Sequence, residues 1–278
     1  MGAYYYDGGL RKRTKTISIT SGKGGVGKTT LISNLALYLG KMGKRVLVLD
    51  GDLGMSNVDI MFGVRSRSNI YNLIIGEREI SDVVTNVADN VDLLPGGSGI
   101  YELQDLDVYQ KKALIDQVDE LAGEYDYMLI DTAPGIAENV LYLNAAADEI
   151  MVILTPDPSS LTDSYSLIKV LNERYRVNNF SVLCNFVKDE KEALRCFQRV
   201  SDVAMDYLNV RLQYKGFVPL DQNLRNATKS QQLILNSNPR CPSSFAIKHL
   251  GEKVSGLGQI QEASGGIQMF WHQIVGVA

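Results

Sequence analysis

The chain is poor in the residues that build metal clusters and disulfide frameworks. Its 278 residues include only three cysteines, Cys184, Cys196 and Cys241, and no two of them have the spacing C-x-x-C. This argues against a zinc site and against an iron–sulfur cluster. An odd number of cysteines without a signal peptide fits reduced thiols, so we expect a cytoplasmic location.

Long apolar runs and an excess of positive charge are also missing. No apolar stretch approaches the roughly 20 residues that a transmembrane helix needs, and Gly2 lacks the later Ser or Thr of a myristoylation site. The formal net charge is −4, whereas a protein that binds nucleic acid non-specifically normally carries a basic face. We therefore expect no direct nucleic-acid partner.

A phosphate-binding loop is the clearest feature that is present. Residues 22–29 read Gly-Lys-Gly-Gly-Val-Gly-Lys-Thr and match the pattern G-x-x-x-x-G-K-T. A β-branched segment, Ile17–Thr20, precedes the loop, and a helical pattern follows it, so bound phosphates should lie at a helix N-terminus. Lys28 should neutralise the β- and γ-phosphates, and Thr29 should ligate Mg²⁺. The predicted nucleotide-binding residues of this segment are Gly22, Lys23, Gly24, Gly25, Val26, Gly27, Lys28, Thr29 and Thr30.

Strand and helix patterns alternate along most of the chain. This alternation predicts an α/β fold with a doubly wound, mostly parallel sheet and helices on both faces. We expect residues 1–14 to form a mobile leader, 15–250 the phosphate-loop domain, 251–266 a linker and 267–278 an amphipathic helix. The expected strands are Ile17–Thr20, Arg45–Leu49, Val91–Leu94, Tyr127–Ile130, Ile150–Leu154, Phe180–Cys184 and Lys215–Val218, with helical patterns that include Lys111–Leu121, Glu138–Ala146 and Leu161–Arg174.

Acidic residues follow two of the predicted strands, at the edge where the sites of parallel sheets gather. One strand leads into Asp50-Gly51-Asp52, and another leads into Asp131-Thr132-Ala133-Pro134-Gly135. An acid directly after a buried strand can hold Mg²⁺ through water, so Asp131 is a candidate for the metal site. Asp50 and Asp52 could instead simply cap the segment that follows them.

The phosphate loop, the D-x-D motif and the D-T-x-x-G motif together resemble those of the MinD/ParA class of ATPases. That class has the phosphate loop K-G-G-x-G-K-[ST], whose additional lysine is Lys23 here. The resemblance implies ATP and Mg²⁺ as cofactors and slow ATP hydrolysis, with Asp52 orienting the attacking water. It also implies adenine contacts from Asn185, Pro219 and Leu220, although Lys188 replaces the arginine that typically follows the asparagine. The implied catalytic residues are Asp52, Lys23 and Lys28, and the implied metal site comprises Thr29, Asp131 and Asp52.

Lys23 bears on the oligomeric state. Because Lys28 suffices for a single site, a lysine at the rim of the loop would most naturally reach a phosphate on a partner subunit. The resemblance implies a homodimer that sandwiches ATP and separates after the γ-phosphate is lost. The alternative is that Lys23 is a solvated surface lysine.

The C-terminal segment has the pattern of a membrane-targeting helix. Its apolar residues recur at helical spacing around a single tryptophan, a residue favoured at membrane interfaces. We therefore expect peripheral binding to lipid at the inner face of the cell membrane. The alternative is that this helix packs against its own domain. The predicted membrane-contacting residues are Ile267, Phe270, Trp271, Ile274 and Val275.

Within the class, the sequences VLVLDGDLGMSNVDIMFG and YDYMLIDTAPG are most similar to the flagellar-number regulators. This resemblance implies a flagellar partner protein, either a signal-recognition-type GTPase, a switch component or a transcription activator. A division-site regulator and a DNA-partitioning ATPase are the alternatives within the class. A metabolic enzyme of the same fold is a further alternative, disfavoured by the lack of paired cysteines and by the C-terminal segment.

Overall fold

The computed structural model describes residues 13–52, 58–97, 102, 106–121, 123–256 and 266–276. Three sequence predictions therefore fall wholly or mostly outside the described residues. They are the mobile leader, the segment that directly follows Asp52, and the linker beyond Gly256.

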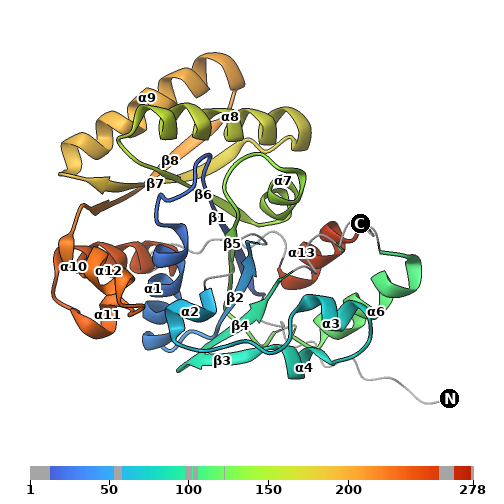
Figure 1. Cartoon of the computed structure of the whole chain (residues 1–278). Coiled ribbons are helices and arrows are strands. Elements are labelled where there is room, and N and C mark those ends of the chain that lie inside the picture. Colours follow the sequence, from blue (N-terminus) through green and yellow to red (C-terminus); the bar gives the residue numbers. More distant parts are fainter. Residues whose placement is uncertain are drawn as a thin grey trace.

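An eight-stranded sheet forms the centre of the domain, in the order β3-β4-β2-β5-β1-β6-β7-β8 (Figure 1). Every pairing is parallel except that of β3 with β4, which is antiparallel. The predicted doubly wound, mostly parallel sheet is therefore confirmed, whereas the edge strand β3 was not predicted. The strands are β1 (Lys15–Thr20), β2 (Val46–Gly51), β3 (Thr85–Ala88), β4 (Val91–Pro95), β5 (Tyr127–Thr132), β6 (Glu149–Leu154), β7 (Asn179–Val187) and β8 (Arg211–Pro219).

Helices cover both faces of this sheet. In Figure 1, α1 and α10–α12 lie on one side, and α6, α7 and α13 lie on the other, with α8 and α9 over the β6–β8 end. The described helices are α1 (Lys28–Lys41), α2 (Val58–Phe62), α3 (Ile70–Ile74), α4 (Ile80–Val83), α6 (Val108–Asp119), α7 (Glu138–Ala145), α8 (Pro158–Tyr175), α9 (Glu190–Leu208), α10 (Gln222–Lys229), α11 (Ile234–Ser237), α12 (Pro242–Val254) and α13 (Ile267–Ile274).

The central strands are buried on both faces, because successive side chains point to opposite sides of a sheet that helices cover on both sides. Along β2, Val46 and Val48 join the cluster beneath α1, whereas Leu47 and Leu49 join the cluster beneath α6 and α13. Such continuous apolar runs are typical of parallel strands and explain why the sequence pattern identified them. The sheet thus holds its strand ends rigidly, and those ends carry the candidate site.

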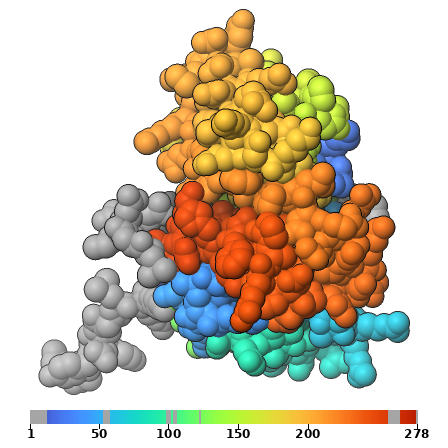
Figure 2. All heavy atoms as spheres, turned by 90° about the vertical axis from the view of Figure 1, so that its left-hand side faces the viewer, coloured from blue at the N-terminus to red at the C-terminus, as the bar shows by residue number. Residues whose placement is uncertain are grey.

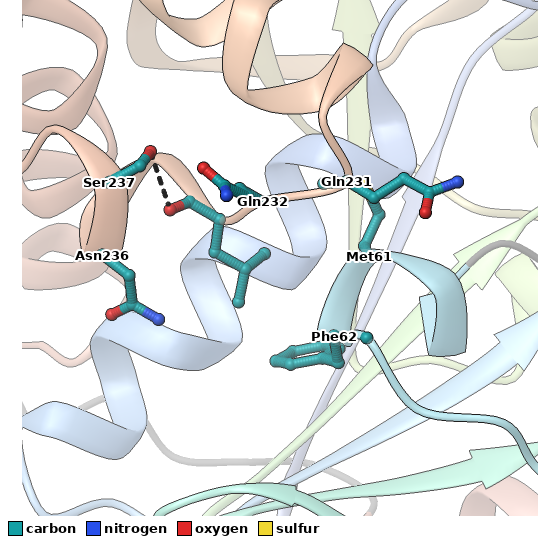
Figure 3. Close-up of a pocket in the computed structure, with 8 residues that line it drawn as sticks. Met61, Phe62, Gln231, Gln232, Asn236 and Ser237 are labelled. Carbon is teal, nitrogen blue, oxygen red and sulfur yellow. Dashed lines mark hydrogen bonds between the residues drawn. The ribbon is translucent and has the colours of Figure 1, made fainter.

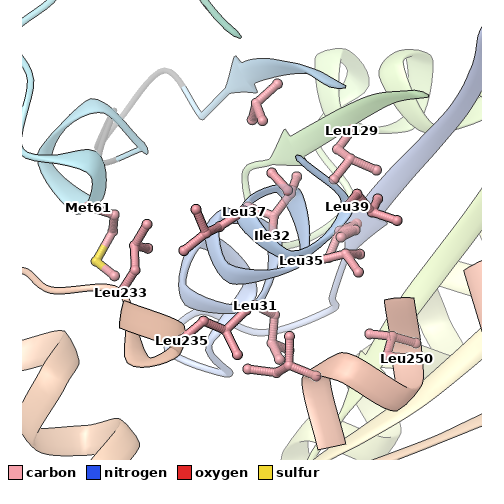
Figure 4. Packing of buried hydrophobic residues seen from close by; sticks show 14 of the residues in the cluster. Leu31, Ile32, Leu35, Leu37, Leu39, Met61, Leu129, Leu233, Leu235 and Leu250 are labelled. Atoms are coloured by element: carbon pink, nitrogen blue, oxygen red, sulfur yellow. The ribbon is translucent and has the colours of Figure 1, made fainter. Parts of the chain in front are cut away.

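The helix that follows the phosphate loop is the centre of one core cluster. Figure 4 shows Leu31, Ile32 and Leu35 of α1 packed among side chains from β5 and from the α11–α12 region. In Figure 2 the orange atoms of α10–α12 cover this face of the molecule. The position of α1 is therefore fixed by packing along its length.

The boundary predicted at residue 250 falls inside a helix. α12 continues to Val254, and Gly251 and Val254 are buried. A Cβ atom at Gly251 would lie 2.3 Å from Cδ1 of Tyr38, so the glycine allows α12 to approach α1 closely. In the sequence this glycine suggested a linker, but the structure uses it for helix packing.

A buried ion cluster joins four strands at the end of the sheet opposite the phosphate loop. The Glu149 carboxylate forms ion pairs with Lys15 at 2.6 Å and Lys215 at 3.0 Å. It also accepts a hydrogen bond from the Ser181 hydroxyl at 2.6 Å. Burial alone would raise the pKa of Glu149, but the two lysines outweigh it and lower the pKa to about 2. The carboxylate therefore ties β1, β6, β7 and β8 together.

Replacing Glu149 with glutamine is expected to destabilise the fold by about 2 kcal/mol near pH 7, because two largely buried lysines lose their counter-charge. A pKa that is lower in the folded state contributes stability above the unfolded value of 4.5, and this contribution is lost as the pH falls from 4.5 towards about 2. Urea unfolding at several pH values measures both effects. A difference between the two proteins that is independent of pH would contradict this assignment.

Candidate functional site

The phosphate loop connects β1 to α1 and is braced by distant parts of the chain. Gly27 has a φ of 91° and forms the N-cap of α1, a conformation that glycine adopts without strain. Asn185 Nδ2 donates to the Val26 carbonyl at 2.7 Å. A Cβ atom at Gly22 would lie 2.1 Å from the Asp163 carbonyl carbon, because α8 packs directly on the loop. The loop is thus held in shape from both sides.

Lys28 lies inside the site. Its side chain is buried, and its ammonium donates to the Ser21 hydroxyl at 3.1 Å. Burial lowers the pKa of Lys28, while the charges of Asp131 and Asp52 oppose that shift. A partly desolvated ammonium beside N–H groups of a helix N-terminus suits the binding of phosphate oxygens.

Thr29 and Asp131 meet at the strand edge, as expected for a magnesium site. The Thr29 hydroxyl donates to Asp131 Oδ2 at 2.7 Å, and Asp131 is buried. Burial raises the pKa of Asp131 to about 7, although the Thr29 hydrogen bond acts in the opposite direction. Among the described residues, nothing donates a hydrogen bond to Asp131 Oδ1. A buried carboxylate oxygen of this kind beside a hydroxyl fits Mg²⁺, which otherwise takes water and phosphate ligands.

Asp50 and Asp52 have different environments. Asp50 is buried, and it accepts the backbone N–H of Asp52 at 3.2 Å and that of Val58 at 3.4 Å. It therefore holds the two ends of segment 53–57, which itself lies outside the described residues. Asp52 is half-buried, and its charge acts on both Lys28 and Asp131. The charge of Asp50 also acts on Asp131, so both aspartates lie near the predicted metal site.

The D-T-A-P-G segment is bonded to β1 and to Ser21, the residue directly before the phosphate loop. The Gly135 N–H donates to the Ser21 carbonyl at 2.9 Å, and the Thr132 hydroxyl donates to the Ile19 carbonyl at 3.1 Å. A conformational change in this segment would therefore act on the residues that lead into the phosphate loop.

Lys23 projects from the rim of the loop, and its side chain is 44% exposed. Its ammonium lies 2.6 Å from Asp157 Oδ2 and 2.6 Å from the Ser159 hydroxyl. Asp157 caps α8, and the hydrogen bond from Lys23 lowers the pKa of this carboxyl. Sequence reasoning missed Asp157, although an aspartate followed by proline at the start of a helix marked it as a cap.

The predicted adenine contacts come from the ends of β7 and β8. Asn185 is buried and bonded to the phosphate loop, whereas Leu220 is 64% exposed. Pro219 ends β8, and the Leu220 N–H donates to the Val187 carbonyl at 2.8 Å. The structure therefore places Asn185 against the loop, with Pro219 and Leu220 at the end of the neighbouring strand, and one N–H of the Asn185 amide is bonded to the loop. Thr30 lies near α10, with its hydroxyl 3.5 Å from that of Thr228.

The predicted membrane helix, α13, packs against α6 and β1 (Figure 1). Each predicted lipid-contacting residue is buried in the core cluster, so the apolar face points inward: Ile267, Phe270, Trp271, Ile274 and Val275. Among the described residues no acceptor lies within hydrogen-bonding distance of the Trp271 indole N–H. None of the helices in the described ranges is long and apolar enough to cross a membrane.

A separate cavity of about 400 Å³ lies between α2 and the α10–α11 region (Figure 3). Met61, Phe62 and Gly63 form one wall, and uncharged residues from Gln231 to Ser237 form the other. The α11 wall is anchored to α1, because the Leu235 N–H donates to Asn34 Oδ1 at 3.3 Å. The lining residues carry no charge and include none of the phosphate-loop residues, so this cavity is distinct from the triphosphate site.

Comparisons with known proteins identify relatives along nearly the whole chain. The model of a family described as an AAA domain matches residues 14–182. The antiactivator FleN of Pseudomonas aeruginosa is 34% identical over 261 residues, which cover 94% of this chain and 93% of FleN. The flagellum site-determining protein YlxH of Helicobacter pylori is 32% identical over 268 residues, which cover 94% of this chain and 90% of YlxH.

Solved structures share the fold. A chain of the MinC:MinD cell division protein complex of Aquifex aeolicus has a TM-score of 0.71 and 26% identity, and the match covers 90% of this chain and 99% of that one. The septum site-determining protein MinD of Pyrococcus horikoshii, complexed with Mg-ADP, has a TM-score of 0.69 and 26% identity. The match covers 89% of this chain and 98% of that one.

Proposed function

Because the chain belongs to the MinD/ParA class of ATPases and lies close to its flagellar-number regulators, we propose that it is an ATP-dependent dimerising switch. In this proposal it binds the inner face of the cell membrane reversibly and acts on a flagellar partner protein. The similarity to FleN and YlxH supports the flagellar role.

The observation that carries the proposal is the position of Lys23. Its ammonium lies at the rim of the phosphate loop, partly exposed, and pairs with an exposed carboxylate, Asp157. An exposed ion pair of this kind contributes little to stability, so Lys23 can leave it at low cost. We infer that in the ATP-bound dimer Lys23 exchanges Asp157 for a phosphate bound by the partner subunit.

The other residues of the site supply the chemistry of slow ATP hydrolysis. Lys28 and the N-terminus of α1 neutralise the phosphates, and Thr29 with Asp131 would hold Mg²⁺, which offsets charge on the β- and γ-phosphates. Asp52 orients the attacking water, and it sits where Lys28 and Asp131 both feel its charge. Positioning of this kind suffices for a loose phosphoryl-transfer transition state.

In this proposal the docked α13 is the released state of a reversible membrane anchor. Its apolar side chains are buried against the domain, so the docked helix hides the surface that would bind lipid. A short helix binds a bilayer weakly, whereas two helices on one dimer bind far more tightly through effective concentration. Dimerisation over ATP would thus favour the membrane-bound form.

Vesicle sedimentation tests the switch and the anchor together. With phosphatidylglycerol-containing vesicles, we expect the protein to pellet in a non-hydrolysable ATP analogue and to remain in solution in ADP. Removal of residues 267–278 should abolish pelleting. Equal pelleting in both nucleotides, or no effect of the truncation, would overturn the switch-and-anchor proposal.

Two adjacent substitutions provide a matched control. Trp271→Ser should reduce pelleting, because burial of a large aromatic side chain contributes to lipid binding in each of the two copies on a dimer. His272→Ser should leave pelleting unchanged, since His272 lies on the polar side of the helix. Loss of Trp271 also weakens the packing of α13 on its own domain, and this effect alone would release the helix and increase pelleting. Reduced pelleting would therefore show that Trp271 contacts lipid.

A division-site role is the second candidate, and the similarity to MinD structures favours it. Deletion of the gene distinguishes the two roles. We expect an altered number or placement of flagella, whereas minicells with normal flagella would favour the division role.

A further inference from the structure

Two apolar side chains extend into solvent at the start of α6. Val108 is 79% exposed and Tyr109 is 86% exposed, the two highest values among the large apolar side chains of the described residues. Asp107 precedes them and caps the helix by accepting the Tyr109 N–H at 2.8 Å. Because this cap fixes the first turn of the helix, the fold itself places both side chains on the surface.

Two lysines lie beside these side chains. Lys112 is exposed and lies one helical turn from both Val108 and Tyr109, and Lys111 is partly buried. Within the described part of the chain, neither lysine forms an ion pair. Cations stabilise the C-terminal end of a helix, yet α6 has its lysines near the N-terminal end and no basic residue in its last turn. The stability of the helix therefore does not explain these two charges.

The exposed turn adjoins the helix that we propose as the membrane anchor. α13 lies antiparallel to α6 (Figure 1). At one end Gln268 Nε2 donates to Asp119 Oδ1 at 3.0 Å, and at the other end a Cβ atom at Gly276 would lie 3.8 Å from Lys111 Nζ. The first turn of α6 is therefore beside the end of α13, and a bilayer that receives α13 there would also be close to this turn.

The anchor helix has no strong cation of its own. The sequence of α13, IQMFWHQI, contains neither lysine nor arginine. The first turn of α6 offers two ammonium groups that attract anionic lipid. It also offers a tyrosine, whose apolar ring and polar hydroxyl suit the interface between lipid and water. The two helices thus carry complementary parts of a membrane-binding surface.

Another exposed apolar group, near the end of α9, has the opposite charge around it. Tyr207 is 76% exposed and Met205 is also exposed, but Asp202 and Asp206 are exposed beside them. An anionic bilayer would repel these carboxylates. The start of α6 is therefore the better match to anionic lipid, and Tyr207 is a suitable control for Tyr109.

We propose that the first turn of α6 is a second lipid-contacting site, in which Val108 and Tyr109 enter the headgroup layer and Lys111 and Lys112 bind anionic lipid. This inference rests on the proposed membrane anchor. One basic residue close to an anionic membrane strengthens binding about fivefold. The contribution of the two lysines should therefore depend on anionic lipid and decrease at high salt.

Sedimentation with two kinds of vesicle tests the charges, with the full chain in a non-hydrolysable ATP analogue. One kind consists of phosphatidylcholine, and the other also contains phosphatidylglycerol. We expect Lys111→Gln with Lys112→Gln to bind the anionic vesicles about 10-fold more weakly than the wild-type protein and the neutral vesicles within about twofold. Lys169→Gln with Lys191→Gln makes the same change of charge on exposed positions of α8 and α9 and should bind both kinds as the wild-type protein does.

Two exposed tyrosines test the apolar contact. Tyr109→Ser should weaken binding to both kinds of vesicle by about threefold or more, since burial of the ring at the interface is partial. Tyr207→Ser should leave binding unchanged.

Trp271 provides a check on the docking of α13, because it is the single tryptophan of the chain. Unchanged fluorescence of a variant without vesicles shows that α13 remains docked, so that weaker binding reports lipid contact. Because Lys111 lies beside the end of α13, Lys112→Gln alone is the second variant, and it should weaken binding to anionic vesicles by about fivefold.

Two results would overturn this inference alone. One is wild-type affinity of both lysine variants for anionic vesicles, and the other is an equal loss in Tyr109→Ser and Tyr207→Ser. Either result would leave the exposed turn as a surface for another protein. Absence of ATP-dependent pelleting by the wild-type chain with both kinds of vesicle would instead overturn the proposed function together with this inference.

Discussion

Lys23→Ala is expected to remain monomeric in saturating ATP while it still binds the nucleotide. In the proposed dimer, Lys28, Thr29 and the N-terminus of α1 would form the phosphate site of each subunit, and their described hydrogen bonds do not involve Lys23. The dimer interface, in contrast, would lose the Lys23 ammonium, which in the proposed dimer is buried against a phosphate bound by the other subunit. Truncating such a charge pair typically costs about 2–5 kcal/mol, so the dimerisation constant should weaken by about 100-fold or more. Light scattering after gel filtration measures the mass, and calorimetry measures ATP affinity.

Asp157→Asn is the matched control for Lys23→Ala. It removes the charge that holds Lys23 within its own subunit but keeps an oxygen that can cap α8. Because Lys23 is then easier to release, this variant should dimerise at the same or a lower ATP concentration than the wild-type protein. Unchanged dimerisation of Lys23→Ala would show that Lys23 does not act across the interface.

Asp52→Ala is expected to bind ATP but hydrolyse it about 100-fold more slowly, or slower still. In the proposed mechanism the carboxylate orients the attacking water, and loss of one such positioned group typically costs about 100-fold or more in turnover. Because the γ-phosphate persists, the variant should accumulate as a dimer in ATP. Phosphate release measures turnover, and light scattering measures the dimer.

An aspartate away from the site controls for general effects of charge. Asp89 is exposed between β3 and β4, and Asp89→Ala should hydrolyse ATP at the wild-type rate. Normal turnover by Asp52→Ala would assign the water-orienting role to another residue.

The sequence predicted those parts of the site that lie in short local motifs. Gly27, Lys28 and Thr29 occur within one loop, and Asp131 directly follows a buried strand, so strand order alone implied that they meet. The parallel sheet could also be predicted from the sequence, because its central strands are apolar on both faces. α9 was not among the helices named from the sequence, although Asp189 caps it and its buried residues recur at helical spacing.

Other features depend on contacts between residues far apart in the chain. Lys23 and Asp157 are separated by 134 positions, and nothing local to either one indicates the pair. The apolar stripe of α13 suits lipid and a protein groove equally well, so its docking on α6 could be stated only as an alternative.

The packing of α13 against α6 affects the proposed equilibrium of this helix between the protein and the lipid bilayer. When the helix leaves, apolar residues of α6 such as Leu114, Ile115 and Val118 lose their cover, so transfer to a bilayer gains little net apolar burial. The unpaired indole N–H of Trp271 favours departure, because interfacial water can satisfy it, which is worth about 1–3 kcal/mol. In the proposed switch, this contribution reduces the free-energy difference between the docked and the lipid-bound helix. The presence of a second α13 helix on the same dimer would then be enough to shift the helices from the docked to the lipid-bound state.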